Sequence, residues 1–189
     1  MMDSPFNNWH SDKQAIGLLE TYEKMFYRLK DLPINYLEVG IAHGESLQWA
    51  RDYFGRECKI VGVDIHKPDM APEGSHIYMI NQMDSAGLDD MAKKEGPFDI
   101  IIDDGAHTRP TAESTFNALY PHLKKGGFYI IEDWGAGYLP QNKHCVGLEA
   151  LVTELIWKYG GSIHNKRGNF ALIDSEPRRG YGGYMEIQK

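Results

Sequence analysis

The sequence predicts an α/β fold in which a mostly parallel sheet of seven strands carries helices on both faces and ends in an antiparallel hairpin. One observation is that short runs rich in Ile, Val and Tyr, each ending in polar residues, alternate with amphipathic stretches of helical length. A second is that the last two strand-like runs are separated only by PRRGYG. Parallel strands need a long crossover, whereas strands joined by a short turn pair antiparallel.

The first predicted element is a helix in SDKQAIGLLETYEKMFYRL, residues 11–29, where Ser11 and Gln14 have the spacing of a capping box. Apolar side chains then recur at helical spacing: Ile16, Leu19, Tyr22, Phe26 and Leu29. Strands are predicted at residues 35–40, 59–65, 76–80, 98–103, 128–133, 169–176 and 183–189. Further helices are predicted near residues 45–54, 85–95, 110–123 and 147–159. We therefore expect a single domain over 1–189, with residues 1–34 as an N-terminal lid or helix and 35–189 as the core.

Composition narrows the class of protein. The chain has 189 residues and a formal net charge of −7, which argues against a nucleic-acid binder with a basic face. No stretch approaches the roughly 20 apolar residues that span a bilayer, and the N-terminus lacks the pattern of a secretory signal. Cys58 and Cys145 fit no zinc spacing. We expect a cytoplasmic protein with reduced cysteines and with neither a nucleic acid nor a membrane as partner.

The ends of the first two predicted strands indicate a nucleoside cofactor. Gly40 and Gly44 in EVGIAHGES allow a tight turn into a helix, and Asp64 follows Gly40 by 24 residues at the end of the next strand. An acid at that place can accept hydrogen bonds from the hydroxyls of a ribose. The G-x-G-x-x-G pattern of dinucleotide folds is absent, and Glu38 would repel phosphate but suit an ammonium group. These residues favour S-adenosylmethionine over NAD, although glycines after a strand are also common punctuation.

Two later strands end in pairs of acids, Asp103-Asp104 and Glu132-Asp133. If these strands are neighbours, the four carboxylates meet at one edge of the sheet and raise one another's pKa. A shared proton, a basic partner or a divalent metal would relieve the repulsion, and oxygen ligands suit Mg²⁺. The alternative is that each pair is solvated and one acid caps the next helix.

His107 lies three residues after Asp104 and is the candidate general base. A hydroxyl attacks poorly until its proton leaves, and imidazole titrates near neutral pH. A metal that binds the same hydroxyl lowers its pKa, after which methyl transfer is mainly a task of alignment. The alternative is that His107 caps the helix that begins near Pro110.

Several motifs carry a resemblance to a known family. The segments SDK, YLEVGIAHGESLQWARDYFG, KIVGVDI, DIIIDDGAH and LKKGGFYIIEDW resemble the class I S-adenosylmethionine-dependent methyltransferases of the macrocin and mycinamicin sugar O-methyltransferase type. The resemblance runs from about residue 9 to residue 160. Members of this family have a Rossmann-like fold, methylate sugar hydroxyls of natural products and use Mg²⁺.

The resemblance also implies site residues. It implies that Asp104, Glu132 and Asp133 hold Mg²⁺, that His107 is the base, that Glu38 and Gly40 hold the methionine end of the cofactor, and that Asp64 holds its ribose. NQMD, residues 81–84, falls where relatives contact the adenine. The full set of candidate cofactor-binding residues is Glu38, Gly40, Gly44, Ser46, Asp64, Gln82, Asp84 and Asp103.

The leading hypothesis is therefore a Mg²⁺-dependent S-adenosylmethionine O-methyltransferase that acts on a sugar or polyol hydroxyl of a small molecule. Two alternatives remain open: a catechol-like O-methyltransferase, and a non-catalytic protein that binds a nucleotide or NAD. Residues 134–146 are rich in Gly and Pro and are a candidate lid, in which aromatic side chains such as Trp134 either stack on the acceptor or pack against the sheet. A homo-oligomer is possible in either case.

Overall fold

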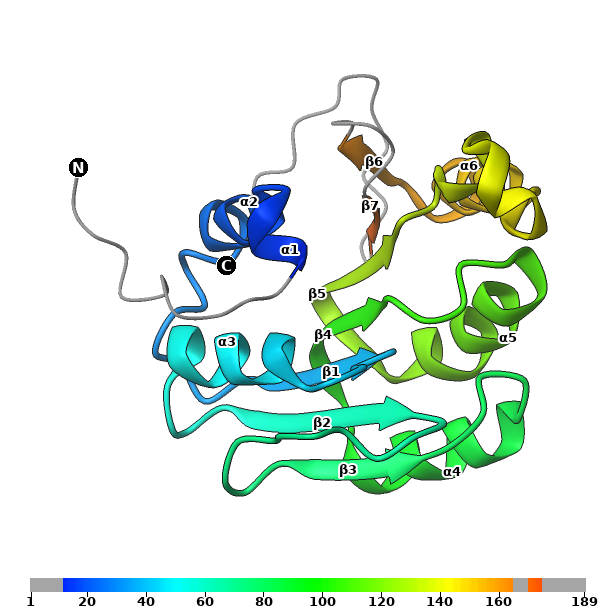
Figure 1. The fold of residues 1–189 in the computed structure, drawn as a ribbon. Coiled ribbons are helices and arrows are strands. Elements are labelled where there is room, and N and C mark those ends of the chain that lie inside the picture. The colour runs from blue at the N-terminus through cyan, green and yellow to red at the C-terminus, as the bar shows by residue number, and fades with distance from the viewer. Residues whose placement is uncertain (1–11, 165–169, 175–189) are drawn as a thin grey trace.

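The computed structural model describes residues 12–164 and 170–174, and within them seven strands form one sheet in the order β3-β2-β1-β4-β5-β7-β6 (Figure 1). The strands are β1 Asn35–Val39, β2 Lys59–Asp64, β3 His76–Met79, β4 Phe98–Asp103, β5 Leu123–Glu132, β6 Gly161–His164 and β7 Phe170–Asp174. The first five run parallel, and β7 runs antiparallel to both β5 and β6. The prediction of a mostly parallel sheet is confirmed.

Helices cover both faces of the sheet (Figure 1). On one face lie α2 Leu18–Met25, which follows the short α1 Asp12–Ala15, and α3 Glu45–Phe54; on the other lie α4 Ser85–Glu95, α5 Arg109–Leu119 and α6 Leu148–Tyr159. Three short 3-10 helices complete the set: η1 Tyr120–His122, η2 Ala136–Tyr138 and η3 Pro140–Cys145.

Successive residues of the central strands alternate between two hydrophobic cores. Ile100, Ile102 and Ile130 pack with the aromatic side chains of α2 and α3, whereas Ile101 and Ile131 pack with α4, α5 and α6. This alternation follows from the period of two in a strand. With both faces buried, the strands read as continuous apolar runs, which explains why the sequence pattern located them.

The predicted N-terminal helix is wrong in its extent. The predicted helix is interrupted at Gly17, whose φ of +74° is left-handed, and its second part, α2, ends at Met25 rather than at residue 29. Ile16, expected to face the core, is 50% exposed. Glycine adopts the left-handed conformation without the steric cost that other residues meet, so the break turns α1 away from the direction of α2. Ser11, the predicted cap, lies outside the described residues.

The predicted C-terminal hairpin is also corrected. Strand β7 lies between β5 and β6, so its antiparallel partners are those two strands. The predicted partner, 183–189, lies outside the described residues, and β6 was not predicted. Its four residues, GSIH, follow Gly160 at the end of α6 and carry too short a pattern to be recognised as a strand. Separately, no helix among the described residues is both long enough and apolar enough to cross a membrane.

Phe116 tests the core beneath α5. Its ring is 2% exposed and contacts Tyr120, Tyr129 and Tyr159 at centroid distances of 4.6, 4.9 and 5.3 Å. Phe116→Ala should lower the free energy of unfolding by about 3–5 kcal/mol, because a cavity replaces these contacts. Urea denaturation measures the loss. Trp157→Ala, at a side chain that is 85% exposed, is the control and should cost no more than about 0.5 kcal/mol; similar losses in both variants would contradict this account of the core.

Candidate active site

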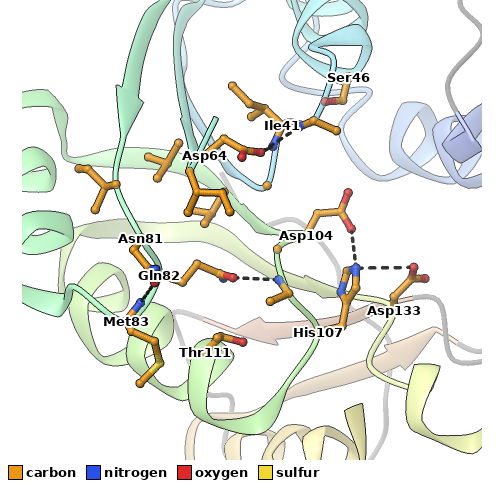
Figure 2. Close-up of a pocket in the computed structure, with 18 of the residues that line it drawn as sticks. Ile41, Ser46, Asp64, Asn81, Gln82, Met83, Asp104, His107, Thr111 and Asp133 are labelled. Atoms are coloured by element: carbon orange, nitrogen blue, oxygen red, sulfur yellow. Dashed lines mark hydrogen bonds and ion pairs between the residues drawn. The ribbon is translucent and has the colours of Figure 1, made fainter. Parts of the chain in front are cut away.

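A cavity of about 640 Å³ opens at the carboxyl ends of β1, β2 and β4 (Figure 2). The chain enters the sheet at β1, extends through β2 and β3 on one side, and returns to β4 and β5 on the other. The cavity therefore lies where the strand order reverses, which is where open α/β sheets bind their ligands. Its volume is in the range of small-molecule sites.

The turn after β1 requires glycine at two positions. Gly40 has a φ of +87°, and a Cβ there would lie 2.1 Å from the backbone carbonyl oxygen of Asp104. Gly44, at the N-terminus of α3, has a φ of +99°, and a Cβ would lie 2.0 Å from the carbonyl oxygen of Met70. The predicted tight turn is thus confirmed. Gly40 lines the cavity, whereas Gly44 acts through the shape of the turn.

Asp64 lines the cavity and also holds the turn in place (Figure 2). Its Oδ2 accepts hydrogen bonds from the backbone N–H groups of Ile41 and Ala42, both at 3.0 Å, and its Oδ1 accepts one from His66 N–H at 3.0 Å. The carboxylate predicted to bind a ribose therefore has a structural role that the spacing alone did not reveal. Ser46, another predicted contact, also lines the cavity and is 7% exposed.

Gln82 connects the cavity wall to the layer beneath it. Its Nε2 donates to Asp103 Oδ1 at 2.8 Å and to Thr115 Oγ1 at 3.0 Å, and its Oε1 accepts from Ala106 N–H at 2.8 Å. Burial, and then the nearby charge of Asp104, raise the pKa of Asp103 to about 7 against these hydrogen bonds. The amide thus fixes the turn that carries Ala106.

Besides Gly44, three predicted cofactor residues are not among the described residues that line the cavity: Glu38, Asp84 and Asp103. Asp84 is the N-cap of α4, where its side chain accepts a hydrogen bond from Gly87 N–H at 3.0 Å. Asp103 and Glu38 are 3% and 0% exposed. The structure therefore gives Asp84 a capping role and places the other two behind the cavity wall.

The acids at the strand ends form two groups that share Asp104. In the first, Lys13 of α1 lies among three carboxylates, with Nζ 3.0 Å from Glu38 Oε1, 2.7 Å from Asp104 Oδ2 and 2.6 Å from Glu132 Oε1. Lys13 is 6% exposed. Burial lowers the pKa of its ammonium, but the three carboxylates outweigh burial and hold that pKa well above its usual range. This is the basic partner that remained open as an alternative to a metal.

Two tyrosines complete this first group. The Tyr22 hydroxyl donates to Glu132 Oε1 at 2.7 Å, and the Tyr36 hydroxyl donates to Glu38 Oε2 at 2.9 Å. One ammonium against three carboxylates leaves two formal negative charges uncompensated among these side chains. Burial, and then the neighbouring Asp104 and Glu38, raise the pKa of Glu132 to about 8 against the effect of Lys13, so either a shared proton or a further cation can offset the remaining charge.

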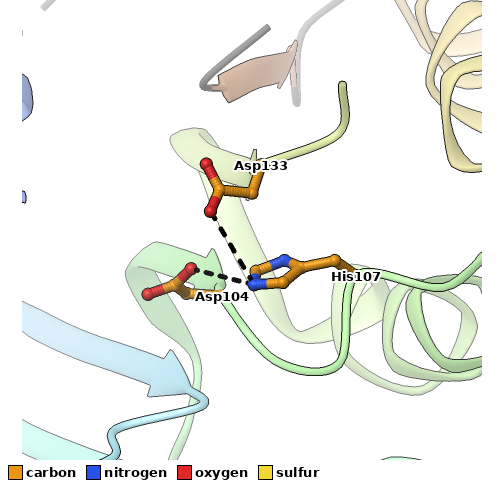
Figure 3. Close-up of side chains that lie close together, drawn as sticks. All are labelled: Asp104, His107 and Asp133. Atoms are coloured by element: carbon orange, nitrogen blue, oxygen red, sulfur yellow. Dashed lines mark ion pairs between the residues drawn. The ribbon is translucent and has the colours of Figure 1, made fainter. Parts of the chain in front are cut away.

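The second group faces the cavity and contains Asp104, His107 and Asp133 (Figure 3). His107 Nε2 lies 3.8 Å from Asp104 Oδ1 and 3.9 Å from Asp133 Oδ2. The candidate ligand atoms of the three side chains all lie within 4.8 Å of one another. Asp133 is half exposed, and the side chains of Asp104 and His107 are 20% and 24% exposed. Two carboxylates and an imidazole at the mouth of a cavity can hold a hard cation and accept a proton beside it.

Backbone strain is concentrated at this cavity. Among the described residues, four that are not glycine have a positive φ, and three of them line the cavity: Ala42 at +45°, His107 at +52° and Asp133 at +48°. Such conformations cost of order 1–3 kcal/mol each and are typical of functional sites. Two of these strained residues, His107 and Asp133, belong to the second group, in which His107 Nε2 faces both Asp104 and Asp133.

Sequence reasoning brought Asp104 next to His107, Asp133 and Glu132, but it missed Lys13 and both tyrosines. The signal was present, because four acids at one edge require a cation and the motif SDK supplies one. The predicted metal ligands remain a prediction, and in this geometry Glu132 faces Lys13 rather than Asp133.

The aromatic side chains of the candidate lid, residues 134–146, differ in burial. Trp134 is 7% exposed and packs in the core with α6, so the packing alternative holds for this residue. Tyr138 is 68% exposed. His144 is also exposed. Neither is among the described residues that line the cavity. The prediction that this segment covers the acceptor stays a prediction.

Comparison with known proteins is consistent with this geometry. Residues 37–134 match the family described as Methyltransferase domain. The chain is 38% identical, over 127 residues, to the 8-demethyl-8-(2-methoxy-alpha-L-rhamnosyl)-tetracenomycin-C 3'-O-methyltransferase of Streptomyces olivaceus, covering 63% of this chain and 32% of that protein. It is 35% identical, over 128 residues, to the mycinamicin VI 2''-O-methyltransferase of Micromonospora griseorubida, with the same two shares. The chain thus spans about a third of the length of these curated relatives.

A solved structure shares the fold. The methyltransferase MycE, crystallised with Mg, SAH and mycinamycin VI, superposes with a TM-score of 0.69 at 28% sequence identity, covering 88% of this chain and 51% of that chain.

Gln82 offers a test of the cavity wall. Gln82→Met should lower the free energy of unfolding by about 1–3 kcal/mol, because Asp103 Oδ1 and Ala106 N–H would lose a buried partner. Thermal or urea denaturation measures the loss. Met83→Gln changes the next residue, which is 57% exposed, and should alter stability by no more than about 0.5 kcal/mol. Equal stability of wild type and Gln82→Met would show that these hydrogen bonds do not hold the turn.

Proposed function

The chain belongs to the Methyltransferase domain family, and from this premise we propose that it transfers a methyl group from S-adenosylmethionine to a hydroxyl of a small molecule, with a divalent cation such as Mg²⁺. The observation that carries the proposal is the position of Asp104. Its carboxylate joins the cavity, His107 and the buried acids in one arrangement.

The cavity fits the proposed methyl donor. The glycine turn, Asp64 and Ser46 form one side of it, and Gln82 and Met83 form another. A sulfonium cofactor carries positive charge, and Asp104 and Asp133 at the mouth supply negative charge within the same cavity. Asp64 keeps one function in the turn and would add a second toward a ribose, since a carboxylate has acceptor capacity for more than the three hydrogen bonds it makes here.

The mechanism assigns separate tasks to the side chains at the mouth. Asp104 and Asp133 would hold the cation, with Glu132 as the further predicted ligand. When bound, a hard dication lowers the pKa of a hydroxyl that coordinates it. His107 would accept the hydroxyl proton and so leave the acceptor oxygen free to attack the methyl group that the sulfonium cofactor would supply, with the neutral thioether as the leaving group. The cavity wall contributes alignment and the exclusion of water.

We propose a sugar hydroxyl of a glycosylated natural product as the acceptor. The names of the relatives support this choice, because they are methyltransferases of rhamnosyl tetracenomycin and of mycinamicin VI. The catechol-like alternative keeps the same donor and metal and differs only in the acceptor. We also propose that the protein is cytoplasmic and that it can form a homo-oligomer.

The test measures methyl transfer from labelled S-adenosylmethionine to a panel of rhamnosides, other glycosides and catechols, with Mg²⁺ and with EDTA. Transfer to a glycoside that requires Mg²⁺ supports the proposal, whereas transfer only to catechols supports the alternative acceptor. Binding is measured in parallel by thermal shift. A rise in melting temperature with NAD, and none with S-adenosylmethionine or its demethylated product, would refute the proposed activity.

His107 separates catalysis from cofactor binding. His107→Ala should lower kcat by roughly 10²–10⁴-fold, because the acceptor hydroxyl loses its base, and should leave the Kd for S-adenosylmethionine within about twofold. Steady-state kinetics and calorimetry measure the two quantities. His76→Ala, at a half-exposed histidine on β3 that pairs with Glu95, is the matched control and should retain kcat. A collapse of cofactor affinity in His107→Ala would instead assign that residue a structural role.

A further inference from the structure

Lys13 occupies the position of a cation in a carboxylate cluster. One carboxylate oxygen from each of Glu38, Asp104 and Glu132 lies within 4.8 Å of the other two. The Lys13 ammonium lies 2.6–3.0 Å from one oxygen of each side chain. Two of these acids, Asp104 and Glu132, are also predicted metal ligands. The Lys13 ammonium therefore contacts two of the side chains that the proposed divalent cation would need as ligands.

Asp104 would contact both cations, Lys13 through one carboxylate oxygen and the metal through the other. Its Oδ2 contacts Lys13 at 2.7 Å, while its Oδ1 faces His107 at 3.8 Å and, through it, Asp133. A dication bound to Oδ1 would lie within a few ångströms of the ammonium on Oδ2. Like charges at that separation repel strongly inside a protein, where water screens them poorly. Glu132 Oε1 presents the same conflict, since Lys13 and Tyr22 both contact that oxygen.

We propose that Lys13 is an internal competitor of the divalent cation, so that metal binding at Asp104 and Glu132 and the docking of α1 through Lys13 weaken each other. The proposal rests on the metal dependence proposed above and adds a coupling between the metal site and the N-terminal helix. Such coupling is reciprocal: if Lys13 lowers metal affinity, the metal lowers the occupancy of Lys13 in the cluster by the same factor.

The local structure of α1 makes this exchange feasible. The helix has four residues, and Gly17 separates it from α2. Isolated helices of this length have little stability of their own. The contacts of Lys13 therefore hold α1 against the strand ends, and their loss frees a short segment without disturbing α2, whose Tyr22 and Phe26 remain in the core.

The first experiment measures Mg²⁺ binding by calorimetry in the wild type, Lys13→Met and Lys24→Met, all without cofactor. We expect Lys13→Met to bind Mg²⁺ at least about tenfold more tightly, a change of about 1.4 kcal/mol. Lys24 is an exposed lysine of α2, and Lys24→Met should bind as the wild type does. An unchanged or higher Kd in Lys13→Met refutes the competition while leaving metal dependence intact. No binding in any of the three proteins refutes both.

A second pair of variants guards against misfolding, because Lys13→Met leaves three buried carboxylates without their ammonium. Glu38→Gln removes one of these charges, and because both proteins of the comparison carry it, any effect of Glu38 itself on Mg²⁺ binding is the same in both. The comparison is then between Glu38→Gln and the double variant Lys13→Met/Glu38→Gln. Tighter Mg²⁺ binding in the double variant supports competition, and equal or weaker binding refutes it.

A third measurement needs no substitution. Trypsin can cut the bond between Lys13 and Gln14 only when the Lys13 side chain leaves the cluster, and it releases a peptide of residues 1–13, which contains no other Lys or Arg. We expect Mg²⁺ to accelerate this cleavage several-fold, in proportion to its effect on Lys13. Cleavage after Arg56, in an exposed turn, is the internal reference and should not change. Protection of the Lys13–Gln14 bond by Mg²⁺ would overturn the proposal.

Discussion

Electrostatic repulsion among carboxylates at one edge of the sheet is the constraint on which the site depends. Parallel strands place their carboxyl ends side by side, so Glu38, Asp104, Glu132 and Asp133 meet because of topology and not because they attract. Burial makes the repulsion costly, as water cannot screen it. Lys13, Tyr22 and Tyr36 relieve part of it. The part that remains is the charge on which the proposed cation site depends.

The same edge is shaped by backbone contacts that leave little room for change. Gly40 brings the turn after β1 against the Asp104 carbonyl, and Asp64 binds two N–H groups of that turn. On the other side, Gln82 holds the turn that leads from Asp104 to His107. The two sides of the cavity are thus built on adjoining turns. This explains why strained φ values are tolerated at His107 and Asp133.

The sequence located what regular patterns encode. Buried strands such as β4 read as apolar runs ending in acids, and the spacing of these runs was sufficient to place Asp64, Asp104 and His107 around one cavity. It failed where a single residue or a tertiary contact decides the outcome. Gly17 breaks a helix that the apolar spacing favoured, and β6 is too short to show a pattern. The motif SDK offered a basic group, but the sequence did not show which acids Lys13 contacts, because they lie 25 to 119 residues away along the chain.

Lys13, the cation among the three carboxylates, comes from a part of the chain that lies outside the segment matched by the family. The matched segment, residues 37–134, contains Glu38, Asp104 and Glu132 but excludes Lys13. A chain that folds this segment with a different N-terminal region keeps the three carboxylates and must neutralise them in another way, by a metal, by protons or by a basic group from elsewhere. Under the proposed competition, metal affinity would depend on two parts of the chain. The matched domain would supply the ligands, and the helix before it would supply the charge that opposes the metal.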